Sequence, residues 1–187
     1  MLNCPLTNSV NFRPKTNLQT NSLQNQPLYL KPEKTDTFTS TQNTKLIPSF
    51  KGLLGINKQD KYGATALMNA VDKGNKEIVE QLIKAKADLN IQDKYGYTAL
   101  MSAAAKGNNE IVEQLIKAKA DLNIQDNYGY TALRWAVTIG NKEIVEQLIK
   151  AKADLNIQDK DGQTALMWAD ENGYIEITNK LRKAGAK

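Results

Sequence analysis

Few residues of this chain could serve as catalytic groups. Its 187 residues contain no histidine, and Cys4 is the only cysteine. This composition excludes a zinc site built from Cys and His, a His-dependent catalytic triad and an intramolecular disulfide. The sequence has no glycine-rich phosphate loop and no nucleophile placed beside a base. We therefore expect no enzymatic activity, no cofactor and no metal, and nothing in the sequence supports a small-ligand binder.

Aromatic side chains are the stronger candidates, and their chemistry is recognition of another molecule. Tyr, Trp and Arg are the residue types that most often dominate protein interfaces. Such residues gather in positions that differ between four similar segments of the chain. The candidate partner-binding residues are Tyr95, Tyr97, Tyr128, Tyr130, Arg134, Trp135, Thr138, Ile139 and Trp168. An alternative stays open, in which the tyrosines pack across neighbouring loops and the tryptophans pack against the next helix.

These candidates are positioned by a unit of 33 residues. The segment 93–125 begins DKYGYTAL and ends KAKADLNIQ, and the segment 126–158 begins DNYGYTAL and ends the same way. Copies also occupy residues 60–92 and 159–187. A fixed period of this length predicts a solenoid, in which each unit buries its apolar face against its neighbours.

Each unit contains signals for two helices. Thr98 is a natural N-cap, and the segment Ala99–Lys106 that follows is rich in Ala and Leu. Gly107 interrupts this helix, and the apolar spacing from Asn109 to Ala118 predicts a second one. Turn-forming residues then lead to the next unit. Most of the candidate residues would lie on these turns and on the exposed side of the first helix.

The unit D-x-x-G-x-T-A-L-M-x-A-x-x-x-G-N-x-E-I-V-E-Q-L-I-K-A-K-A-D-L-N resembles the ankyrin repeat. The resemblance covers residues 60–187, about two thirds of the chain, in four copies. It implies an all-α ankyrin-repeat helical solenoid of antiparallel helix pairs with β-hairpin-like loops. It also implies a non-catalytic protein–protein interaction module, or scaffold, that binds a protein partner through its hairpin tips and the concave face of its first helices.

The sequence departs from the ankyrin pattern at two positions of the repeat, and each departure predicts a local change in structure. The motif histidine is replaced by apolar residues or arginine, so we expect packing to replace its hydrogen bond. These positions are Met68, Met101, Arg134 and Met167. The glycine that suits left-handed geometry after the second helix is replaced by lysine, which predicts either an altered loop or local strain. These positions are Lys86, Lys119 and Lys152.

The two ends of the array should differ from its middle. Residues 46–59 predict a degenerate N-terminal cap, in which Phe50, Leu53 and Leu54 cover the apolar end of the first repeat. In the fourth repeat, Thr178 and Arg182 stand at positions that hold Val and Ile in the first. We interpret both as stacking positions made polar, and we therefore expect the array to end there.

Residues 1–45 predict a disordered tail. They hold four of the five prolines, and Asn, Gln, Ser and Thr make up 23 of the first 50 residues. Such a composition buries too little apolar surface to offset the entropy of ordering the chain. A second hypothesis makes this tail the functional part, as a targeting segment or a peptide ligand displayed by the array.

Charge and hydropathy limit the kinds of binding partner and the cellular location that the sequence predicts. From residue 51 onward the chain has 20 basic and 18 acidic residues, which does not favour a nucleic-acid partner. No run of 18 apolar residues and no signal peptide is present, so we expect no membrane partner. We expect a cytoplasmic monomer. The repeats resemble those of bacterial ankyrin proteins, including host-associated ones, and export into a host cell without a classical signal peptide stays open as an alternative to the cytoplasmic location.

Overall fold

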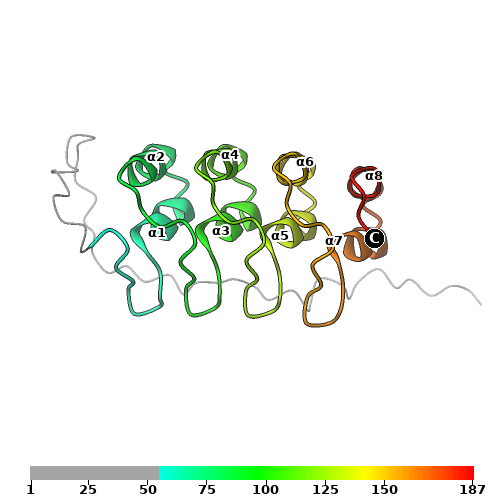
Figure 1. The fold of residues 1–187 in the computed structure, drawn as a ribbon, viewed down its shortest axis with the longest axis horizontal. Helices are drawn as coiled ribbons and strands as arrows, with labels where there is room; N and C mark the ends of the chain where they lie inside the picture. The colour runs from blue at the N-terminus through cyan, green and yellow to red at the C-terminus, as the bar shows by residue number, and fades with distance from the viewer. Residues whose placement is uncertain (1–54) are drawn as a thin grey trace, which may run out of the picture. The chain divides into compact units, whose positions relative to one another are not determined.

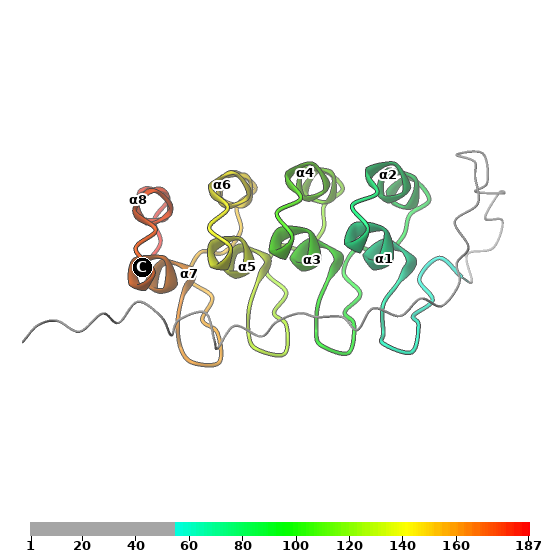
Figure 2. The same ribbon diagram turned by 180° about the vertical axis from the view of Figure 1, so that it is seen from behind.

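A computed structural model describes residues 55–187 as four helix pairs in a row, and Figures 1 and 2 show this row from its two sides. The predicted tail, residues 1–45, and most of the predicted cap, residues 46–54, lie outside the described residues. Within residues 55–187 there are eight helices and no strand. The helices are α1 (Ala66–Asp72), α2 (Lys76–Lys84), α3 (Ala99–Ala105), α4 (Asn109–Lys117), α5 (Ala132–Thr138), α6 (Lys142–Lys150), α7 (Ala165–Glu171) and α8 (Ile175–Lys183).

The local signals place the helices as predicted. The hydroxyl of Thr98 accepts a hydrogen bond from the backbone N–H of Met101, and the equivalent threonines cap α1, α5 and α7 in the same way. Both α3 and α4 end one residue earlier than expected, because Lys106 and Ala118 act as their C-caps. The predicted helix–turn–helix unit is therefore confirmed.

The core lies within each helix pair and between neighbouring pairs. α3 contacts both α1 and α5, and α4 contacts both α2 and α6. Leu100, Val112 and Leu115 are at most 1% exposed in this core. The prediction of apolar packing at the motif-histidine position is confirmed for Met68 and Met101, which are buried. It is wrong for the other two repeats, because Arg134 forms a side-chain hydrogen bond and Met167 is exposed.

The loops project on one side of the row (Figure 1), and backbone hydrogen bonds join neighbouring loops at their tips. Within a loop, the Asp93 carboxylate accepts hydrogen bonds from the backbone N–H groups of Tyr95 and Tyr97, both at 2.9 Å. Between loops, the N–H of Asn127 donates to the carbonyl of Tyr95 at 3.0 Å, and the same bond recurs at both other junctions. The tips therefore form a connected edge rather than four independent loops.

The lysines that replace the family glycine are strained. Lys86, Lys119 and Lys152 have φ of 64°, 69° and 68°, in the left-handed region that disfavours residues with a Cβ. The loop therefore keeps the geometry of the family, and the predicted strain is confirmed.

Lys119→Gly is accordingly expected to raise the free energy of unfolding by about 0.5–1 kcal/mol, as relief of strain outweighs the added chain entropy. Lys117→Gly, two residues earlier in the last turn of α4, is the control and should lower it by about 1 kcal/mol. Urea denaturation measures both, and a loss of stability in both variants would show that the strain at Lys119 is negligible.

The fourth repeat corrects one prediction about its outer face. Thr178 is only 4% exposed, because its position faces the core in every repeat, as the buried Val79 shows. Its hydroxyl has no hydrogen-bond partner among the described residues. Arg182, in contrast, is exposed as predicted and forms an ion pair with Asp170.

Candidate functional site: an aromatic cluster across three repeats

Seven of the nine candidate residues form one chain of contacts, which we call the aromatic cluster. Its members are Tyr97, Tyr128, Tyr130, Arg134, Trp135, Thr138 and Trp168. The ring of Trp135 lies 5.3 Å from that of Tyr97 in the preceding repeat and 5.4 Å from that of Tyr130, measured between centroids. Tyr128 continues the chain toward the loop tip, 6.1 Å from Tyr130. These separations are typical of favourable aromatic pairs.

Arg134 connects the third repeat to the fourth. Its guanidinium carbon lies 4.0 Å from the centroid of the Trp168 ring and 4.6 Å from that of Tyr130, so the cation is held between two aromatic faces. Nη1 donates a hydrogen bond to the hydroxyl of Thr138 at 2.7 Å. Burial lowers the pKa of Arg134 from its usual value, and the neighbouring Tyr130 and Asp159 oppose that shift.

The same junction leaves several buried polar atoms unpaired. Nε of Arg134 lies 3.5 Å from Oδ2 of Asp159, and the two groups form an ion pair. This distance is too long for a hydrogen bond, so neither atom has a hydrogen-bond partner among the described residues. Nη2 of Arg134 and Nε1 of Trp168 also have no hydrogen-bond partner among the described residues. Unpaired buried groups of this kind cost stability, so the third and fourth repeats are joined at some energetic cost.

Trp135 is held differently from Trp168, although both occupy the same position in their repeats. Its Nε1 donates to Oδ2 of Asp126 at 2.9 Å, while Oδ1 of Asp126 accepts from the backbone N–H groups of Tyr128 and Tyr130. Burial raises the pKa of Asp126 above its usual value, and these three hydrogen bonds oppose the rise. This role of Asp126 is not among the sequence predictions, although Asp recurs before every loop tip and that recurrence is a signal of it.

The structure corrects the expectation that all nine candidates are accessible. Tyr97, Arg134, Trp135 and Thr138 are between 2% and 6% exposed, so they pack inside the array. The alternative of internal packing therefore describes Tyr97 and Trp135 in the free chain, and Arg134 and Thr138 are buried with them. Tyr130 and Trp168 are half-buried, and Tyr95 and Tyr128 are each 47% exposed.

Two candidates lie outside the cluster. Ile139 is the C-cap of α5, at the opposite end of that helix from the loop tips, and its side chain lies close to Gly107 of the preceding repeat. Its position at the far end of α5 separates it from the tyrosines of the loop tips. Tyr95 is linked to the next loop through its backbone carbonyl and presents its side chain to solvent.

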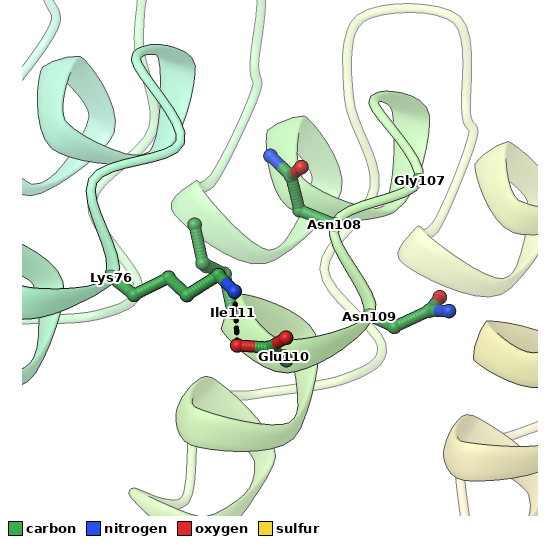
Figure 3. A pocket seen from close by; sticks show the side chains of 6 residues that line it. All are labelled: Lys76, Gly107, Asn108, Asn109, Glu110 and Ile111. Carbon is green, nitrogen blue, oxygen red and sulfur yellow. Dashed lines mark ion pairs between the residues drawn. The ribbon is translucent and has the colours of Figure 1, made fainter.

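A shallow hollow of about 270 Å³ lies elsewhere, between the second helices of the first two repeats. Figure 3 shows Lys76 of α2 reaching across it to form an ion pair with Glu110 at the start of α4. Lys142 and Glu176 form the same pair two repeats later. Because this ion pair recurs along the array and neutralises the only two charges of the hollow, we assign it to stacking of the repeats.

The described residues contain no arrangement that suggests a metal centre. Within residues 55–187, no three His, Cys, Asp or Glu side chains come together as ligands. No helix in this range has the length and apolar character needed to cross a membrane.

The aromatic cluster presents a partly exposed surface of rings and hydroxyl groups at the loop edge, which suits recognition of another molecule.

The comparisons with known proteins agree with this architecture. A family model described as ankyrin repeats (3 copies) matches residues 39–126 and residues 100–187. No curated protein matches the chain. Ankyrin repeats are generally protein–protein interaction modules and typically non-enzymatic. With four stacked helix pairs and a family model that matches more than half of its length, the chain belongs to the ankyrin repeat family.

Proposed function

We propose that this chain is a non-catalytic module that binds a protein partner through the loop-tip edge and the adjoining rim of the aromatic cluster. The observation that carries the proposal is the exposure of Tyr95 and Tyr128, 47% each, at equivalent tips of neighbouring repeats. Tyrosine supplies a large contact area with little conformational entropy to lose on binding. The half-buried rings of Tyr130 and Trp168 extend this surface toward the first helices.

The construction of the tips supports the same proposal. Asp93 and Asp126 fix the backbone at both tyrosines, and a backbone hydrogen bond joins the two tips. The buried members of the cluster, among them Trp135 and Arg134, then act as supports beneath the surface rather than as contacts. A surface that is ordered before binding loses less entropy when a partner docks, which favours affinity.

The test is binding of a partner by the wild type and by a Tyr95→Ala/Tyr128→Ala variant. A partner recovered by affinity capture is purified, and its affinity is measured by titration calorimetry. We expect the double variant to bind about tenfold or more weakly, because both rings belong to the proposed contact surface.

The matched control is Lys117→Ala/Lys150→Ala, which also changes two exposed side chains one repeat apart, but on α4 and α6. It should bind like the wild type. Equal loss of affinity in both double variants, or no loss in either, would remove the tip edge as the binding surface. Thermal denaturation of all variants confirms that the fold is kept.

A second candidate function assigns partner capture or targeting to residues 1–45, with the array as scaffold. It rests on the composition of that segment, which lies outside the described residues. Deletion of residues 1–45 separates the two candidates, because capture by the tip edge survives the deletion and capture by the tail does not. We further propose a monomer that acts in the cytoplasm or after export into a host cell, without a nucleic-acid partner.

A further inference from the structure

The N-terminal end of the described array leaves an apolar face of α2 uncovered. Ile78 is 42% exposed, whereas the residues one, two and three repeats later, Ile111, Ile144 and Ile177, are between 0% and 3% exposed. Leu82 is half-buried, although its equivalent Leu115 is fully buried. In the later repeats this face packs against the second helix of the preceding repeat, as the contacts of α4 with α2 and of α6 with α4 show.

Residues 55–59 stand in the place where a preceding repeat would end. Oδ1 of Asn57 accepts a hydrogen bond from the N–H of Asp88 at 2.9 Å, and Asn90 makes the same bond to the next repeat at the same distance. Nε2 of Gln59 donates to the carbonyls of Gly63 and Gln92, in a pattern that the next two repeats reproduce. The chain therefore enters the array in the register of a complete repeat.

That register determines which residues come next to α2. Counting back 33 positions from α2 leads to residues 43–51, and the family match itself extends back to residue 39. The nine residues immediately before Gly55 read LIPSFKGLL, five of which are large and apolar. They are joined to the anchored residues 55–59 without a linker, which gives them a high effective concentration at the uncovered face.

We propose that residues 46–54 bind the face of α2 marked by Ile78 and Leu82 and complete the N-terminal end of the array. Phe50, Leu53 and Leu54 supply apolar surface that the preceding repeat would otherwise provide. A repeat array needs such covering, because each unit presents an apolar face to its neighbour. This inference concerns the stability of the array and is independent of how the loop tips bind a partner.

The test uses the full chain with Phe50→Asp/Leu53→Asp, and the matched control is Leu28→Asp/Leu30→Asp within residues 1–45. We expect the first variant to lower Tm by about 5 °C or more, since it removes apolar burial from one end of the array. We also expect hydrogen exchange of the α2 amides to become about tenfold faster, with little change in α6. The control should match the wild type in both measurements.

A combined substitution tests direct contact. If Phe50 and Leu53 cover Ile78, then Ile78→Ser lowers Tm less in the Phe50→Asp/Leu53→Asp background than in the wild type. Equal Tm for the Phe50→Asp/Leu53→Asp variant and its control, or additive effects of Ile78→Ser, would overturn the proposal. So would a wild-type dimer in sedimentation that Ile78→Asp converts to a monomer, because a second copy would then occupy this face.

Discussion

Replacement of Gly96 by alanine is expected to lower the free energy of unfolding by about 3 kcal/mol. Gly96 has φ of +83°, a left-handed conformation that costs a residue with a Cβ about 1–2 kcal/mol. A Cβ there would also lie 2.7 Å from the backbone nitrogen of Asn127 and 2.8 Å from the Cα of Asp126. Because these are backbone atoms of the next loop, relief requires the two tips to separate, which adds about 1–3 kcal/mol.

The fourth repeat offers a control with the same backbone and no close neighbour. Gly162 has φ of +78°, and an added Cβ would meet no atom within 4 Å. Gly162→Ala should therefore lower the free energy of unfolding by only about 1 kcal/mol, which is the cost of the left-handed backbone conformation alone. Denaturation in urea measures the difference between the two variants. Equal losses at Gly96 and Gly162 would mean that the tips move apart freely and that the connected edge does not exist in solution.

Trp135→Phe is expected to destabilise the array by about 2–3 kcal/mol. The change removes part of a buried ring and leaves Oδ2 of Asp126 without its hydrogen bond from Nε1. Trp168→Phe is the matched control, because Nε1 of Trp168 has no partner among the described residues. Its cost should stay within about 1 kcal/mol, mainly from weaker stacking on Arg134.

The same pair of variants predicts a pH dependence. Burial raises the folded-state pKa of Asp126 above 3.8, because the buried carboxylate is less well solvated than in the unfolded chain. The contribution of Asp126 to the free energy of unfolding is therefore fully present below pH 3.8 and is lost as pH rises through the folded-state pKa. The hydrogen bond from Trp135 lowers that pKa. Removing this hydrogen bond raises the pKa further and therefore increases the loss of stability as pH rises. The deficit of Trp135→Phe relative to wild type should grow between about pH 3 and about pH 7. A constant deficit over this range would show that Asp126 does not couple to Trp135.

Much of the fold could be predicted because its signals are local. The 33-residue period, the threonine caps and the glycine breaks act within a few residues of where they stand in the chain, and they placed all the helices of the second repeat to within one residue. The strain at Lys119 was also predictable, since it depends on one residue type at one position of the repeat.

The candidate site could be predicted only in part. The variable positions included Tyr128, Tyr130 and Trp168, and the structure brings these three residues into one cluster. Exposure could not be predicted in the same way, because it depends on which side chains of the adjacent repeats fill the space. Ile139 is an example, because it lies at the C-terminal end of α5, away from the loop tips, although it was chosen with the tip residues.

By itself, the sequence determined that this chain repeats, where its helices begin and end, and that its variation is concentrated in aromatic positions. Only the tertiary structure decided what those positions do. Trp135 and Trp168 are the same residue at the same repeat position, yet one donates a hydrogen bond to Asp126 and the other stacks on Arg134. The physical reason is that the surroundings of each tryptophan depend on the preceding repeat, which contributes Tyr97 beside Trp135 and Arg134 beside Trp168.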